Sequence, residues 1–233
     1  MKPLAEEALH IWREKDCFAA VEHLMQQDDP LASIEAFHEL MRHCYWQLKD
    51  LFGAITFGRA GAQHAFASAA HLDAGQADLA RELRHRGKGF FYDIASFTWP
   101  GWNEQGIAIT ASDLATGFDA ARTNLRLAEQ LQRGDLPMSR AHWVLGAQRL
   151  AAGDRAAARE AFIAAAEYAE KANSRADLLL AHGYMHLVDL LIGPDEAARR
   201  QLDEVKRDLR GQEDGEFFIE QLETAQRVFA SLK

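Results

Sequence analysis

Residues that build β-sheets and break helices are scarce in this sequence. Val, Ile and Thr together number 20 among 233 residues and Pro only 5, whereas Ala alone accounts for 42. Alanine has the highest helix propensity, and β-branched residues fill many strand positions. The balance therefore predicts an all-α protein. With 48% hydrophobic residues, the chain can also bury a sizeable core, which excludes a disordered tail.

Cysteine and positive charge are also in short supply. Cys17 and Cys44 have no paired spacing, which excludes a disulfide framework or zinc knuckle and suits a reducing compartment. Lys+Arg 26 against Asp+Glu 35 gives a net charge of −9, which repels nucleic acid and anionic lipid. Glu6 and Glu7 stand where a signal peptide needs an apolar stretch, and no long uncharged apolar run follows. We therefore expect a cytoplasmic protein without a nucleic-acid or membrane partner.

Turn signals divide the chain into segments of helical length. The segments predict helices, with no strand required, at residues 4–27, 31–51, 54–72, 76–97, 111–133, 138–151, 154–171, 174–192, 195–209 and 216–231. Gly53 marks one of the expected breaks. Ser112 or Asp113 suits the cap of the fifth helix, and Pro194 suits a first helical turn.

A repeat of about forty residues runs through the second half of the chain. Ala-Ala-Arg occurs at 120–122, 157–159 and 197–199, each time inside a predicted helix. The apolar stripe Ala158, Phe162, Ala165 and Ala169 returns forty residues later as Ala198, Leu202, Val205 and Leu209. In the preceding helices, Ala141, His142, Leu145, Leu150 and Gly153 return as Ala181, His182, Met185, Leu190 and Gly193. The repeating unit is thus a pair of helices.

One helix pair carries Leu145-Gly146 in its first helix and Ala158, Phe162 and Ala165 in its second. In this it resembles the tetratricopeptide repeat (TPR) family, whose consensus has a Leu-Gly pair followed by a small–aromatic–small series. The resemblance is best from Ser139 to Ala172 and extends over roughly 60–210. The next unit departs from it, because His186 stands where the consensus has glycine.

The resemblance implies a single TPR-like domain over residues 1–233, folded as a right-handed α–α superhelix of about ten helices. Residues 1–60 then form N-terminal helices with a weak repeat match, 61–210 the repeat region and 211–233 a capping helix. The capping helix would cover the last open face with Phe218, Leu222, Ala225 and Phe229. In such a stack each helix pair buries its apolar face against the next pair. A globular bundle of amphipathic helices is the alternative.

Catalytic motifs for nucleophilic attack or phosphate binding are missing from the sequence. Three Glu-x-x-His triplets, Glu7 with His10, Glu35 with His38 and Glu82 with His85, have the spacing used by dinuclear metal bundles. With 18 Glu and 10 His, chance alone yields about 0.8 such triplets, so three is a small excess. His182, His186 and Asp189 share one helix face that suits a metal ion, but a histidine at a helix seam more often binds a backbone carbonyl. We expect no catalytic residue, metal or cofactor.

Two local features stand out against this background. Arg84, Arg86 and Lys88, together with Arg81, form a basic island that suits a phosphate, a carboxylate or an acidic peptide. The alternative is a solvated face balanced by nearby acids. Residues 97–107 form a long connection that contains Trp99 and Trp102, and long loops in compact repeats often carry function. These tryptophans either anchor a ligand in the groove or pin the loop to the scaffold.

By the family's pattern, the groove-facing positions of the best unit are Arg140, Trp143, Ala147, Leu150 and Ala151. They offer an aromatic and aliphatic surface, and the Lys and Asn clamp with which TPR proteins hold acidic chaperone tails is not evident. The resemblance thus implies a non-catalytic interaction module. Its groove would bind a protein or peptide segment through Trp143, Arg140, Leu150 and the tryptophans of the long connection.

Two other functions stay open at this stage. The first is a helical-bundle metalloprotein or enzyme that uses the Glu-x-x-His pairs. The second is a sensor in which a small anion bound at Arg84, Arg86 and Lys88 changes the curvature of the helical stack. A second copy of the chain is a further candidate partner, because exposed end faces of a repeat stack permit a homodimer.

Overall fold

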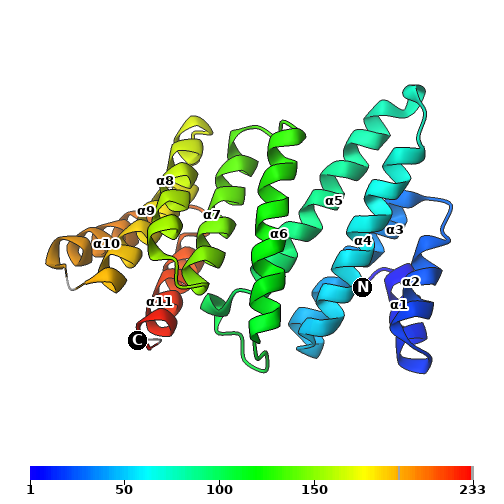
Figure 1. Cartoon of the computed structure of the whole chain (residues 1–233), viewed down its shortest axis with the longest axis horizontal. Helices are drawn as coiled ribbons and strands as arrows, with labels where there is room; N and C mark the ends of the chain where they lie inside the picture. The colour runs from blue at the N-terminus through cyan, green and yellow to red at the C-terminus, as the bar shows by residue number, and fades with distance from the viewer. Residues whose placement is uncertain (194, 232–233) are drawn as a thin grey trace. The chain divides into compact units, whose positions relative to one another are not determined.

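The computed structural model describes residues 1–193 and 195–231. Within this part of the chain it contains eleven α-helices and no strand, so the protein is all-α, as its composition predicts. The chain forms two compact units, Met1–Phe97 and Thr98–Lys233. Within each unit, helices pack against their neighbours in sequence, as in a helical solenoid (Figure 1).

The first unit is built around a long helical hairpin. Its elements are α1 (Pro3–Glu14), α2 (Cys17–Met25), α3 (Pro30–His43), the π-helical turn η1 (Cys44–Leu48), α4 (Leu51–His71), the 3₁₀ turn η2 (Ala74–Gln76) and α5 (Ala77–Phe97). The hairpin partners α4 and α5 lie side by side (Figure 1). A Cβ at Gly61 would collide with the Phe90 ring, and one at Gly87 would lie 2.9 Å from the Phe66 ring. Each helix thus leaves a glycine-sized space for a phenylalanine of the other.

Two helices of the first unit begin and end differently from the sequence expectation. The segment 4–27 is two helices, because the Asp16 side chain accepts a hydrogen bond from the Ala19 amide at 2.8 Å and starts α2. The next segment ends in η1, after which Lys49 adopts a left-handed φ of 54°. Asp50 then caps α4 through the Gly53 amide at 2.9 Å. Gly53 therefore lies inside α4 and does not break a helix.

The second unit contains the repeated helix pairs. Its elements are the 3₁₀ turn η3 (Pro100–Trp102), α6 (Ala111–Gln130), α7 (Asp135–Ala151), α8 (Arg155–Lys171), α9 (Arg175–Ile192), α10 (Glu196–Leu209) and α11 (Gly215–Ser231). Figure 1 shows α6, α7 and α8 side by side. Thr110 caps α6, with Asp113 completing a capping box. Pro194, expected in a first helical turn, lies outside the described residues.

The apolar rows of α8 and α10, forty residues apart, are buried alike, whereas Leu145 and Leu150 of α7 are buried and their counterparts Met185 and Leu190 of α9 are only partly buried. Ala158 and Ala198, Phe162 and Leu202, Ala165 and Val205, and Ala169 and Leu209 are buried in both helix pairs. The Leu-Gly pair has a packing role, since a Cβ at Gly146 would lie 2.7 Å from the Phe162 ring. Small residues here let neighbouring helices approach closely while a bulky side chain fills the adjacent space.

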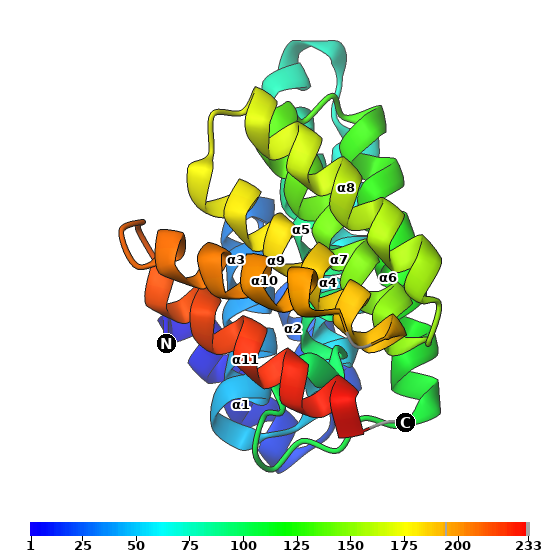
Figure 2. The same cartoon turned by 90° about the vertical axis from the view of Figure 1, so that its left-hand side faces the viewer.

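The last helix, α11, packs against α9 and η3 and lies beside α10 (Figure 2). Leu222, Ala225 and Phe229 are buried, whereas Phe218 is only partly buried and Ile219 completes the buried row. A Cβ at Gly183 of α9 would lie 2.7 Å from a methyl carbon of Leu222. The final helix therefore closes on the face formed by α9 and the tryptophan-containing segment.

Candidate binding surfaces

An aromatic cluster fills the face of the second unit where sequence analysis expects a groove. Trp99 lies at its centre, with ring centroids 5.4 Å from Trp102, 5.8 Å from Trp143, 5.9 Å from Tyr184 and 6.0 Å from Phe229. The rings come from the connection before α6 and from α7, α9 and α11. Most of these contacts are edge-to-face or tilted, arrangements that aromatic pairs prefer over a face-to-face sandwich.

The cluster brings together three predicted site residues and buries two of them. Trp99 is 1% exposed and Trp143 6% exposed, while Trp102 keeps partial exposure beside Phe217. Leu150, a fourth, is also buried, within α7. Trp99, Trp143 and Leu150 therefore present little surface to a partner in this structure. Of the two roles considered for the tryptophan segment, Trp99 has the contacts of a residue that pins its connection to the scaffold.

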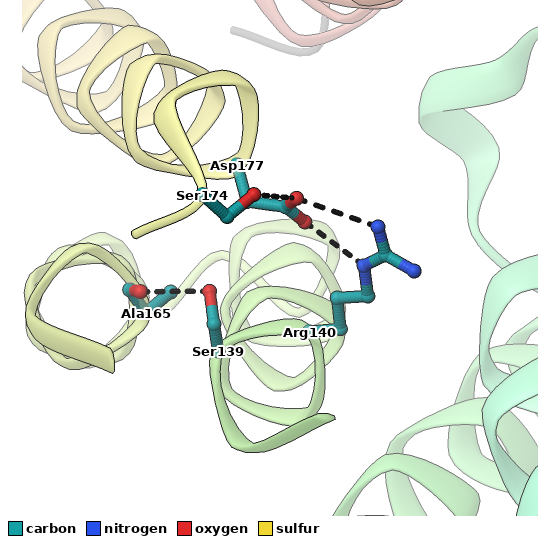
Figure 3. Close-up of polar contacts among 5 residues, drawn as sticks. All are labelled: Ser139, Arg140, Ala165, Ser174 and Asp177. Atoms are coloured by element: carbon teal, nitrogen blue, oxygen red, sulfur yellow. Dashed lines mark hydrogen bonds and ion pairs between the residues drawn. The ribbon is translucent and has the colours of Figure 1, made fainter. Parts of the chain in front are cut away.

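Arg140 is engaged in a polar network at one end of α7, α8 and α9 (Figure 3). Its Nε donates to Oδ1 of Asp177 at 2.9 Å and its Nη2 to Oδ2 at 3.4 Å. Ser174 Oγ donates to the same carboxylate at 2.6 Å. One residue before Arg140, the buried Ser139 hydroxyl donates to the Ala165 carbonyl at 2.8 Å. Arg140 thus links α7 and α9, which are the first helices of two successive helix pairs.

The basic island lies on α5, in the first unit, and its charges are partly compensated. Arg86 donates to the Glu82 carboxylate at 2.7 Å, and Arg84 donates to the Ala69 carbonyl at 3.3 Å. Lys88 is buried, at 8% exposure. Two of the three predicted anion-binding residues are therefore occupied by partners within the unit, and the third has little contact with solvent.

The residues considered as metal ligands form contacts of other kinds. Glu35 pairs with Lys2, Glu82 with Arg86, and Asp189 with Arg159 at 2.7 Å. Among the described residues, three or more His, Cys, Asp or Glu side chains do not gather anywhere in a way that suits a metal ion.

A different surface of the second unit is open. Two adjoining hollows of about 200 and 230 Å³ lie between α8 and α9 and share Glu170 and Leu178. We call the hollow of about 200 Å³, which is lined by Ile163, Ala166, Glu167, Glu170, Leu178, His182 and Met185, the α8–α9 groove. Since α8 and α9 are antiparallel neighbours, the groove runs along both helices, and the other hollow adjoins it at the turn that joins them.

The α8–α9 groove combines an apolar floor with an acidic rim. Ile163, Leu178 and Met185 are only partly buried, and Glu167 and Glu170 are exposed. Neither glutamate forms an ion pair or a side-chain hydrogen bond with another described residue. Arg175, at the turn end, is paired with Asp208 at 3.4 Å. The groove therefore has an apolar floor and a negatively charged rim.

His182 adds no positive charge to the groove near neutral pH. Burial lowers the pKa of His182 below its usual range, Arg175 lowers it further, and Glu170 acts in the opposite direction. Burial likewise lowers the pKa of His142, which lies on α7, and of His186, which lies one turn after His182 on α9. The two glutamates therefore determine the charge of the rim.

Sequence analysis does not identify the α8–α9 groove as a site. Its signal is one large apolar residue off the buried row of each helix: Ile163 lies off the Ala158–Phe162–Ala165–Ala169 row of α8, and Met185 is a partly exposed apolar residue of α9. A helix that packs on one side only needs no large apolar side chain outside its buried row. Exposed glutamates carry no such signal, because they are common on any solvated helix.

Comparisons with known proteins add no family to this geometry. Models of protein families give no match to the chain, and a search of curated proteins finds no similar sequence. Among the described residues, no helix combines the length and the hydrophobicity needed to cross a lipid bilayer.

Proposed function

We propose that this protein is a non-catalytic interaction module whose second unit binds a segment of another protein. The observation that carries the proposal is the α8–α9 groove, in which Ile163, Leu178 and Met185 form an open apolar floor between two helices. Helices recognise amphipathic partner segments through such grooves, with apolar anchors spaced along the partner. The groove replaces the aromatic face as the binding surface, because the chain's own α11 and residues 99–102 cover that face.

The TPR resemblance is part of the same proposal. The burial of the apolar rows of α8 and α10, forty residues apart, supports it, as does the packing of the Phe162 ring against Gly146. Stacked helix pairs give rigid surfaces suited to binding extended or helical segments. We also propose a cytoplasmic location, supported by two unpaired cysteines. Burial raises the pKa of the Cys44 thiol to about 12, which makes it unreactive.

Site-specific photo-crosslinking tests the proposal. An aliphatic diazirine side chain replaces Met185 in the groove, and the same side chain at Ile192 serves as the control, since Ile192 is apolar, exposed and on the same helix outside the groove. We expect position 185 to crosslink to a defined protein segment that position 192 does not reach. The purified segment should then bind the native chain and lose affinity for a Met185→Gln variant. Equal crosslinking at both positions, or an unchanged affinity, would contradict the proposal.

A further inference from the structure

The rim of the α8–α9 groove indicates the chemistry of the segment that fits it. Glu167 and Glu170 are exposed and unpaired, Arg175 is already paired with Asp208, and His182 is neutral near pH 7. A segment that enters this groove therefore meets two negative charges and no free positive one. An acidic segment would place like charges together, which is unfavourable at an interface.

The length of the groove sets the length of the contact. Ile163 and Glu170 stand seven residues apart on α8, as do Leu178 and Met185 on α9. At 1.5 Å per residue, this corresponds to about 10 Å, or two turns of a partner helix. Two turns present apolar side chains at positions i, i+4 and i+7 on one face. Lysine or arginine side chains flanking that face reach outward toward the rim.

We propose that the α8–α9 groove binds a basic amphipathic helix. Its apolar residues contact Ile163, Leu178 and Met185, and its flanking lysines or arginines pair with Glu167 and Glu170. The net charge of −9 for the whole chain favours the approach of such a segment, because long-range attraction raises the association rate. This inference rests on the proposed function and adds the chemical class of the partner.

Two designed peptides test the inference with the full chain. Both are helices of about 14 residues with leucine at the same i, i+4 and i+7 positions; lysine fills the flanking positions in one and glutamate in the other. Fluorescence anisotropy gives the affinity of each peptide at low and high salt. We expect the lysine peptide to bind, to weaken as salt rises, and to bind at least tenfold more tightly than the glutamate peptide.

Two double variants locate the charge effect. Glu167→Gln with Glu170→Gln should weaken the lysine peptide about threefold to tenfold, as expected for two exposed ion pairs. Glu216→Gln with Glu220→Gln removes the same charge from exposed positions of α11 and should leave the affinity unchanged. Equal weakening by both double variants would overturn the inference, because it would assign the attraction to net charge.

A third variant separates failure of this inference from failure of the proposed function. Met185→Gln keeps the side-chain length but makes the groove floor polar. If the two peptides bind equally and both weaken in Met185→Gln, the basic partner class is overturned while the groove keeps its role. If Met185→Gln leaves both affinities unchanged, neither peptide uses the groove, and the proposed function is contradicted as well. Circular dichroism verifies that each variant is folded.

Discussion

The two faces of the second unit use apolar residues in opposite ways. On one face, Trp99 is 1% exposed and lies among four aromatic rings from three other elements of the unit and its own segment. On the other, Ile163, Leu178 and Met185 line a hollow that the described part of the unit leaves open. The aromatic face is part of the folded core. The three apolar residues of the groove are of the kind found in a core, but they remain partly exposed to solvent.

This difference shows that the repeat alone does not determine which face stays open. Both α8 and α10 carry a buried apolar row, but the tryptophan segment and α11 pack mainly on the side of α7 and α9. Large aromatic side chains contribute strongly to stability when buried. A partially exposed apolar floor adds less to stability and is available to a partner. The comparison therefore predicts that stability and binding respond to different substitutions.

The largest effect is expected at the centre of the aromatic cluster. Trp99→Ala removes a fully buried ring and leaves a cavity among Trp143, Tyr184 and Phe229, so it should lower the free energy of unfolding by about 3–5 kcal/mol. Urea unfolding followed by circular dichroism measures the change. Trp99→Phe is the matched control and should lose less than half as much, since it keeps an aromatic ring. A similar loss in both variants would contradict the packing explanation.

A smaller effect is expected where α11 meets α9. A leucine at position 183 would collide with Leu222, which already approaches within 2.7 Å of a Cβ built there, so Gly183→Leu should cost about 1–3 kcal/mol. Adding Leu222→Ala should recover part of that loss, which the double-mutant cycle measures. Gly193→Leu, at the C-cap of α9, is the control, because nothing lies within 4 Å of its Cβ position. Additive losses would show that α11 does not close on Gly183.

Acid is expected to lower the free energy of unfolding of the protein through three histidines of the second unit. Burial lowers the pKa values of His142, His182 and His186 in the folded protein, so the unfolded chain binds more protons than the folded one below about pH 6.5. Stability should be constant above about pH 7 and fall as the pH drops through 6.5. The effect per histidine is expected to be smaller than that of Gly183→Leu, because all three are only partly buried.

Urea unfolding at several pH values measures this dependence. The triple variant His142→Gln, His182→Gln and His186→Gln should have a shallower decline than the native chain. His43 and His64 of the first unit, whose pKa values burial also lowers, account for part of the remaining slope. An unchanged slope in the triple variant would show that these histidines do not couple to folding.

The sequence predicts the repeated helices better than the contacts between distant segments. The alanine rows are visible because positions forty residues apart share both chemistry and burial, as Ala158 and Ala198 do. The break at Asp16 was missed, since a cap depends on one side-chain hydrogen bond that periodicity does not encode. For Trp99 the sequence offers pinning to the scaffold as one of two roles but not its contact residues, because no local pattern connects it to Tyr184 and Phe229. The groove was missed for the same reason: it depends on which surfaces remain uncovered.

The smallest effect on stability is expected in the groove itself. Met185→Ala removes a partly exposed side chain, and alanine has a slightly higher helix propensity, so the free energy of unfolding should change by less than about 1 kcal/mol. The same variant should weaken binding of the lysine peptide more than Trp102→Ala does, although Trp102 is the larger residue and touches the aromatic cluster. Urea unfolding measures the effect of each variant on stability, and fluorescence anisotropy measures its effect on peptide affinity. If Met185→Ala destabilises the chain as much as Trp102→Ala while leaving peptide affinity intact, the groove floor is ordinary core and the contrast between the two faces disappears.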